Sequence, residues 1–393
     1  MKNLLILNGS HSEISLIEEA KKLGFYVITS GSAPELIGHS YADEYVAGDY
    51  SDKELMLQIA QDKKIEAVIS CANDFGIITA SYIAEKMGLK GHDSYETTLC
   101  LHQKDQFKQF ALKNNMQVVQ SDTYTDISQA ISKRDDYQYP IIVKPVDLTG
   151  GKGVRRINVP GDYEESIRVA FKMSRVNRIV IEQFVEGSYH SFSTFLVNKQ
   201  VVATYSDNEY SFLNPYLVAA SAGPAKNVEE IRSILIRQAE FVAKRLDLVN
   251  GVFHMQYVMD KNRKPYIIDI TRRCSGDLYS EPVEYSVGIP WSKWIVMSES
   301  GFPEDYFCER GTQKKFCGRC CIMAKQNGKV RNVKIADEIR SNIYKNIQWW
   351  KKGDLINNYL VDKLGVLFWE FSTEDEMYEK LNSIGELIQV EVI

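Results

Sequence analysis

The stretch PYIIDITRRCSGD, residues 265–277, decides the fold because an apolar strand in it runs directly into a dense group of polar side chains. Asp269 and Thr271 alternate with isoleucines, two arginines follow, and a Ser-Gly-Asp turn closes the stretch. Side chains two residues apart lie on the same face of a strand. Asp269, Thr271 and Arg273 are therefore expected on one face, which predicts a site built on the end of this strand.

The preceding segment, GVFHMQYVMDKNRK (251–264), is predicted to form the other strand of a hairpin. A turn between Asn262 and Arg263 without a bulge places Gln256 opposite Asp269. Opposed Cβ atoms lie about 5 Å apart, which lets two oxygen-bearing side chains share a hard cation. A solvent-exposed polar face would show the same pattern, so the hairpin alone leaves both interpretations open. The polar residues expected on the shared face are His254, Gln256, Asp269 and Thr271.

A second informative stretch is VKPVDLTGGKGVRRI, residues 143–157, which predicts a strand, a glycine loop and another strand. Glycines around Lys152 give a flexible loop whose amides can surround phosphate oxygens, although a plain hairpin turn has a similar composition. Lys144 ends the apolar strand, where a buried ammonium is costly without an anion. The loop lacks the GxxxxGK[ST] pattern and connects two strands, so it is not a Walker loop.

Residues 1–93 alternate between strand and helix patterns, which predicts βαβ units and a parallel sheet. Ligands bind beyond the carboxyl ends of the strands in such sheets. Two loops are expected there, NGSHSE with His11 and SCANDFG with Asn73 and Asp74. NGSHSE is not a GxGxxG nicotinamide motif. Its SHSE sequence also resembles a helix capping box, so His11 has a structural interpretation beside a substrate-facing one.

The remaining patterns predict the other elements. They indicate a helix over 94–115, a hairpin over 191–210 turning near Asn198 and Lys199, and a helix over 227–246. In the tail they indicate strands around CCIMAK and LFWEF, with helices between and after them. The CGRCC cluster, residues 317–321, favours a buried strand over a zinc site because neither a second cysteine pair nor a histidine is near.

Composition excludes several classes of protein. The chain has 393 residues, enough for two or three packed units, and its net charge of −5 argues against nucleic acid as a partner. No apolar run of about 18 residues predicts a membrane span. The number of cysteines, seven, is odd and the chain is long, which favours the reducing cytoplasm over a disulfide scaffold.

In this order, the glycine loop, the segment IVIEQFVEG (179–187) and the polar hairpin resemble the ATP-grasp superfamily. The resemblance is to the branch of carbamoyl phosphate synthetase, biotin carboxylase and amino acid ligases. It implies an α/β fold of the α+β ATP-grasp type. The implied parts are a Rossmann-like parallel-sheet domain (1–98), a lid subdomain (99–186), and an antiparallel-sheet catalytic domain with a closing segment (187–393).

The resemblance also implies roles for individual residues. Arg273 and Lys152 would be catalytic, Glu182 would accept the adenine amino group, and the loop from Gly150 to Val154 would cover the β- and γ-phosphates. The residues implied for ATP are Lys104, Lys144, Gly150, Gly151, Lys152, Gly153, Val154, Glu182, Phe184 and Val185. Those implied for magnesium, with manganese as the alternative metal, are Gln256, Asp269 and Thr271. Those expected near the substrate are His11, Asn73, Asp74, Arg272, Gly276 and Asp277.

The sequence departs from the family pattern at the metal positions. Gln256 and Asp269 stand where glutamates are usual, although glutamine occurs in carbamoyl phosphate synthetases, and Thr271 stands where asparagine is usual. Tyr189 stands where many members have an acid on the ribose. These changes lower the formal charge of the site and bear on how many metal ions it takes. Arg272 is compatible either with a substrate carboxylate or with a surface salt bridge.

The activity implied is that of an ATP-dependent carboxylate–amine ligase, in which ATP converts an acid to an acyl phosphate that an amine then attacks. The expected partners are small carboxylates and amines, with neither nucleic acid nor a membrane. A homodimer is compatible because many relatives are dimers. The alternatives are an ATP-grasp kinase or carboxylase that transfers phosphoryl groups to a small molecule, and a nucleotide-binding regulator with a decayed metal site.

Overall fold

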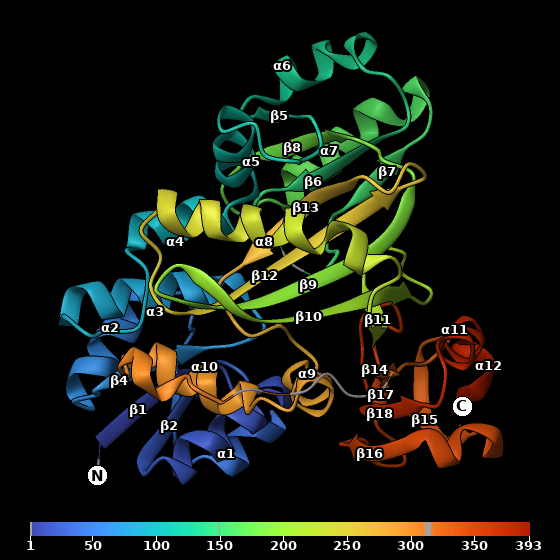
Figure 1. Ribbon diagram of the computed structural model, residues 1–393. Helices are drawn as coiled ribbons and strands as arrows, with labels where there is room; N and C mark the ends of the chain where they lie inside the picture. Colours follow the sequence, from blue (N-terminus) through green and yellow to red (C-terminus); the bar gives the residue numbers. More distant parts are fainter. Residues whose placement is uncertain (1, 149, 310, 312–315) are drawn as a thin grey trace.

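The N-terminal part of the chain forms a parallel sheet, as its strand and helix alternation predicts. In the computed structural model, which describes residues 2–148, 150–309, 311 and 316–393, the strand order is β3-β2-β1-β4 (Figure 1). The strands are β1 (Lys2–Leu7), β2 (Phe25–Gly31), β3 (Glu44–Ala47) and β4 (Ala67–Ser70). Its helices are α1 (Ile14–Lys22), α2 (Lys53–Asp62) and α3 (Asp74–Met87). The short strand β3 is the one element of this sheet that the sequence did not reveal.

The helix expected over 94–115 is two helices. They are α4 (Tyr95–His102) and α5 (Lys104–Lys113). Gln103 separates them because its backbone is extended, with φ −93° and ψ 117°. The break makes Lys104 the first residue of α5.

A four-stranded antiparallel sheet in the order β5-β8-β6-β7 lies at the top of Figure 1. Its strands are β5 (Ser121–Tyr124), β6 (Ile141–Pro145), β7 (Arg155–Ile157) and β8 (Ile179–Gln183), with helices α6 (Ile127–Ser132) and α7 (Tyr163–Met173). The glycine loop joins β6 to β7, as predicted. The three-part division of the chain remains a prediction, and its boundary at residue 186 falls between β8 and β9.

The large sheet has eight strands in the order β13-β12-β9-β10-β11-β14-β18-β16, and every neighbouring pair is antiparallel. Helix α8 (Val228–Arg245) crosses it in Figure 1. The predicted turn at Asn198 and Lys199 is confirmed, and both residues have positive φ. The strands are β9 (Gly187–Val197), β10 (Gln200–Ser211), β11 (Val218–Gly223), β12 (Gly251–Asp260), β13 (Pro265–Thr271), β14 (Phe316–Ile322), β16 (Ile343–Gln348) and β18 (Gly365–Phe371).

The hairpin β12–β13 has the predicted pairing for a different reason. Gln256 lies opposite Asp269, as predicted. Met259, however, lies opposite Pro265, so the turn is centred on Asn262 and not between Asn262 and Arg263. The pairing shifts by one residue between these points, which leaves Ile268 as the extra residue of a bulge. The expectation of a hairpin without a bulge is therefore wrong. The bulge restores the pairing that places the polar side chains on one face.

The C-terminal part corrects another expectation. The strands around CCIMAK and LFWEF are present as β14 and β18, but the segment between them forms strands and a 3-10 helix (Asp337–Asn342). Strands β15 (Gly328–Ile335), β17 (Leu355–Ile356) and β19 (Ile388–Val392) make a small sheet. The segment of β15 forms a strand because its side chains are alternately more and less buried, and a half-buried strand has a period of two residues. Helices α11 (Glu374–Asn382) and α12 (Ile384–Leu387) follow β18, as predicted.

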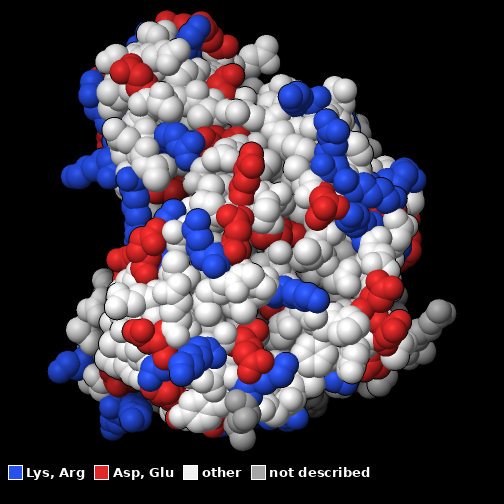
Figure 2. Space-filling model, turned by 90° about the vertical axis from the view of Figure 1, so that its left-hand side faces the viewer, with Lys and Arg blue, Asp and Glu red and all other residues white. Residues whose placement is uncertain are grey.

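Helices α9 (Ser280–Val287) and α10 (Trp291–Glu299) join the N-terminal sheet to the large sheet. One buried cluster includes Leu4 of β1, Phe195 of β9, and Trp291 and Trp294 of α10. The parts of the chain are thus packed together, as the absence of linker sequences predicts. No helix among the described residues is long and apolar enough to cross a membrane. Acidic and basic side chains are interspersed on the face in Figure 2, apart from one basic group at its upper right.

Glu299 predicts a pH dependence of stability. Its carboxylate accepts a hydrogen bond from the Ser70 N–H at 3.1 Å, and burial raises its pKa from 4.5 to about 8. The folded chain therefore holds a proton there that the unfolded chain releases, so stability falls as pH rises from about 4.5 to about 8. Glu299→Gln keeps an acceptor for Ser70 and removes this dependence.

We expect the loss of unfolding free energy between pH 5 and pH 8 to be smaller in Glu299→Gln than in the wild type by on the order of 2 kcal/mol. Urea unfolding at both pH values measures it. Glu304→Gln, on the exposed 3-10 helix Glu304–Tyr306, is the matched control and should behave as the wild type. Equal pH slopes in Glu299→Gln and the wild type would contradict the assignment.

Candidate functional site

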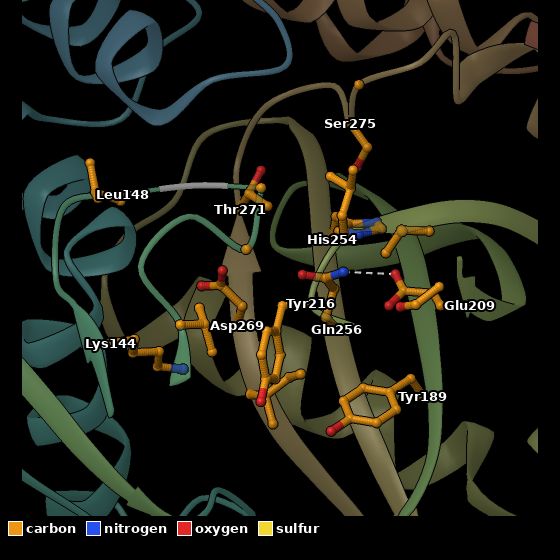
Figure 3. Close-up of a pocket in the computed structure, with 18 of the residues that line it drawn as sticks. Lys144, Leu148, Tyr189, Glu209, Tyr216, His254, Gln256, Asp269, Thr271 and Ser275 are labelled. Carbon is orange, nitrogen blue, oxygen red and sulfur yellow. Dashed lines mark hydrogen bonds between the residues drawn. The ribbon is translucent and has the colours of Figure 1, made fainter. Parts of the chain in front are cut away.

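A cavity of about 390 Å³ lies where the four-stranded sheet β5-β8-β6-β7, the large sheet and the N-terminal part meet. Figure 3 shows Lys144 and Leu148 on one side, the hairpin side chains in the centre, and Tyr189, Tyr216 and Glu209 nearby. Most of the residues predicted from the sequence line it: Asp74, Lys104, Lys144, Gly150, Gly151, Val154, Glu182, Phe184, Val185, Gln256, Asp269, Thr271, Arg273, Gly276 and Asp277. Lys152, Gly153, His11, Asn73 and Arg272 are outside this lining.

The polar face of the hairpin opens into the cavity. Gln256 donates from Nε2 to Oε1 of Glu209 at 2.8 Å (Figure 3), which orients its amide. The Asp269 carboxylate lies 3.8 Å from the Lys104 ammonium. Thr271 Oγ1 accepts from the Arg273 N–H at 3.2 Å and so braces the turn that follows. Among the described residues, no group of three or more His, Cys, Asp or Glu side chains is arranged to hold a metal ion.

Glu209 was missed by the sequence reasoning. It lies on β10, and burial, together with the nearby Asp207, raises its pKa to about 8. Ser191 of β9 lies between Gln256 and Asp207 in the sheet register, so a polar row runs across four strands from Asp269 to Asp207. The only sequence signal was the polar run SDNEY in an otherwise strand-like segment.

Two lysines converge on Glu182 of β8. Lys144 Nζ lies 2.9 Å from Oε2, and Lys108 Nζ lies 3.3 Å from Oε1. Burial alone would raise the pKa of Glu182, but Lys108 and Lys144 together lower it below its ordinary value. Burial lowers the pKa of Lys108 to about 8 despite the attraction of Glu182. Lys104, at the start of α5, donates to the Leu148 carbonyl at 3.0 Å.

The glycine loop has the backbone that only glycine adopts readily. Gly150, Gly151 and Gly153 have φ of +63°, +72° and +74°. A Cβ on Gly151 would lie 2.3 Å from the Tyr216 carbonyl oxygen, so the loop packs closely against the β10–β11 connection. Lys152 at its tip is exposed and points outside the cavity lining. Its predicted catalytic role therefore requires the loop to move toward the cavity.

Arg273 is held by Asp74. The Arg273 Nε donates to Asp74 Oδ1 at 2.9 Å, and His102 Nδ1 lies 3.0 Å from the same oxygen. Burial would raise the pKa of Asp74, but Arg273 and His102 lower it well below its usual range. Asp74 is thus the counter-ion of Arg273. Asn73, also expected near the substrate, is the N-cap of α3 and accepts from the Gly76 N–H; its place near the substrate stays a prediction.

Arg272 also corrects an expectation. Its side chain is buried and lies outside the cavity lining, although the neighbouring Arg273 is part of that lining. Its Nε lies 2.7 Å from Asp93 Oδ2, and its Nη2 donates to the Val249 carbonyl at 2.7 Å. The guanidinium is fully engaged in a buried ion pair. It is therefore neither a substrate ligand nor a surface salt bridge.

The side chain of Asp277, which lines the cavity, contacts three other side chains. Its carboxylate lies 2.6 Å from Lys363 Nζ, 3.2 Å from Arg319 Nη1 and 3.2 Å from His11 Nε2. His11 stacks on Trp349 at 4.1 Å and lies within a capping box formed by Ser10 and Glu13, as the SHSE sequence predicts. A role of His11 near the substrate stays a prediction.

Sequence reasoning missed Arg319 and Lys363. Both line the cavity. Arg319 had a usable signal: it is the one charged residue in the apolar strand FCGRCCI, which is confirmed as buried β14. A buried arginine in such a strand needs an anionic partner. Lys363 lies in a loop far along the chain and had no comparable signal.

Comparisons with known proteins agree with this fold. Residues 103–290 match the family described as "Carbamoyl-phosphate synthase L chain, ATP binding domain". The chain is 22% identical over 281 residues to the carbamoyl phosphate synthase large chain of Campylobacter jejuni, covering 70% of this chain and 25% of that one. It is 22% identical over 260 residues to the alpha-aminoadipate–LysW ligase LysX of Saccharolobus solfataricus, covering 65% of this chain and 86% of LysX.

Solved structures resemble this chain over its whole length. The L-amino acid ligase of Bacillus licheniformis matches with a TM-score of 0.82 and 19% identity, covering 100% of this chain and 99% of that one. The phosphoribosylglycinamide synthetase of Anaerococcus prevotii matches with a TM-score of 0.77 and 20% identity, covering 100% of both chains. The chain spans only about a quarter of the length of the carbamoyl phosphate synthase large chains that it matches.

The Arg272–Asp93 pair predicts a large stability effect. Asp93→Ala leaves a buried guanidinium without its counter-ion, and we expect the unfolding free energy to fall by about 3–5 kcal/mol. Urea unfolding measures it. Glu66→Ala, which removes the exposed partner of Lys2, is the control and should cost about 0–1 kcal/mol. A loss of less than about 1 kcal/mol in Asp93→Ala would contradict this account of Arg272.

Proposed function

We propose that the chain is an ATP-grasp enzyme, and within that superfamily an ATP-dependent carboxylate–amine ligase that forms an amide or peptide bond through an acyl phosphate, because residues 103–290 match an ATP-binding domain and the whole fold resembles that of an amino acid ligase. The observation that carries the proposal is that one cavity joins the lid lysines, the glycine loop, the hairpin oxygens and Arg273. The names of two similar proteins, an amino acid ligase and the LysX ligase, support amide formation over other outcomes.

The nucleotide is proposed to lie between the lid and the hairpin. Lys104 and Lys144 would bind its phosphates, with the loop Gly150–Val154 closing over them. Glu182 would accept the adenine amino group, and the backbone of Phe184 and Val185 would meet the purine edge. The apolar side chains that line the same cavity and suit a purine are Val119, Ile142, Val185, Val258 and Ile268.

Magnesium fits the donors present when a nucleotide supplies the rest of its ligands. Gln256 and Asp269 offer an amide and a carboxylate oxygen on one face. Mg²⁺ is usually held by one or two carboxylates together with phosphates and water, which suits a site without a cage of three acids. When bound, the ion would neutralise charge on the phosphates. The role of Thr271 and the use of Mn²⁺ remain predictions.

The proposed reaction has two steps. An oxygen of the acid attacks the γ-phosphorus of ATP, the bond to the bridging oxygen breaks, and ADP leaves. The amine then attacks the acyl carbon, inorganic phosphate leaves, and the amine loses a proton. Arg273 would stabilise charge on the transferred phosphoryl group, and Lys144 would do so with Lys152 once the loop closes. Arg319 and Lys363, which line the cavity beside Asp277, would attract the carboxylate of the acid substrate.

The second candidate function is a nucleotide-binding regulator. The observation that favours it is the lack of a three-acid metal group among the described residues. Lys144 and Arg273, both in the cavity, favour an enzyme. A kinase or carboxylase would use the same phosphoryl transfer with another acceptor. The cytoplasmic location and a homodimer remain predictions.

Hydroxylamine trapping tests the proposal. Purified protein, ATP and magnesium are incubated with pools of carboxylates, with and without hydroxylamine, and ADP, AMP and hydroxamate are measured. We expect ADP and hydroxamate together in at least one pool. ADP without hydroxamate would favour a kinase, and AMP would contradict phosphoryl transfer to the acid. Bound ATP without turnover in any pool would favour the regulator.

Arg273→Ala is expected to lower turnover at least about a hundredfold, because a cationic donor to the developing charge is lost. The assay is ADP release in the carboxylate pool that gives hydroxamate, with circular dichroism as the check on folding. Lys133→Ala, on the exposed surface of the lid, should leave turnover unchanged. Near-normal turnover in Arg273→Ala would reject its catalytic role.

A further inference from the structure

Lys108 is a buried lysine that lines no part of the cavity yet contacts its wall. It lies one helical turn after Lys104 on α5, and its side chain is only 2% exposed. Its ammonium lies 3.3 Å from Glu182 Oε1 and donates to the Ile267 carbonyl of β13 at 3.2 Å. Burying an ammonium without partners is costly, so the contacts with Glu182 and the Ile267 carbonyl are needed to stabilise Lys108 in this position.

Glu182 has two lysine partners that differ in position. Lys144 lines the cavity at the end of β6, beside the glycine loop, whereas Lys108 approaches Glu182 from behind the cavity wall. Nucleotide phosphates would attract Lys144 away from Glu182. A buried carboxylate without a cation takes up a proton and changes from an acceptor to a donor of hydrogen bonds. Lys108 is placed to prevent that change.

We propose that Lys108 is a positioning residue that determines base specificity, by keeping Glu182 an ionised acceptor for the 6-amino group of adenine. The inference rests on the proposed nucleotide site and adds a residue that acts through Glu182. A 6-amino group donates to a carboxylate, whereas a 6-oxo group repels it. A protonated Glu182 would instead donate to the 6-oxo group of inosine triphosphate.

The test compares the affinities of ATP and inosine triphosphate for the full chain with magnesium, measured by calorimetry. We expect the wild type to prefer ATP. Lys108→Met should reduce the ratio of the two affinities at least tenfold, mainly by weakening ATP. Lys108→Gln retains a donor for the Ile267 carbonyl without the charge and should show the same reduction if Lys108→Met does not fold. Lys108→Arg should restore most of the preference.

Lys113→Met, an exposed lysine on the same helix, is the matched control and should leave the ratio unchanged. An equal loss of both affinities in Lys108→Met and Lys108→Gln would overturn the inference, because a purely structural lysine would not distinguish the bases. A wild type that binds both nucleotides equally would also overturn it. Binding of neither nucleotide by the wild type would overturn the proposed function as well, so the two failures are distinguishable.

Discussion

The pairing of Gln256 with Asp269 across β12 and β13 is the constraint on which the rest of the site depends. A slip of one residue would turn every side chain of a strand to the opposite face. The bulge at Ile268 compensates for the odd-numbered turn, so the polar residues face the cavity while Tyr257 and Ile267 enter the core. One local irregularity thus sets which side chains of the hairpin reach the cavity.

Charges in the cavity are arranged in pairs that ligands could exchange. Arg273 is paired with Asp74, Lys144 with Glu182, and Lys104 lies near Asp269. Each pair reduces the cost of burying its cation in the folded chain. In the proposed reaction, phosphate oxygens would replace carboxylates as the partners of the lysines. The carboxylates would then be available to an amino group or a metal ion.

Much of the fold could be predicted from the sequence because it depends on local patterns. Strand and helix alternation predicted the parallel sheet, whereas the predicted pairing of Gln256 with Asp269 is correct only because a bulge compensates for the wrong turn. The partners of Arg319, Lys363 and Glu209 could not be predicted, because they lie between 42 and 86 residues away along the chain. The helix expected between β14 and β18 failed for another reason: its charged residues suit an exposed strand equally well.

The unusual residues at the positions proposed for the metal have a consistent physical consequence. Gln256 carries no charge, and burial raises the pKa of its partner Glu209 to about 8, so Glu209 is largely protonated at neutral pH. Asp269 is then the main fixed negative charge on this face of the hairpin, and Lys104 lies close to it. A divalent cation alone would gain little there, whereas a cation already bound to nucleotide phosphates brings its own ligands. Under the proposed function, the site would therefore favour joint binding of metal and nucleotide over binding of the metal first.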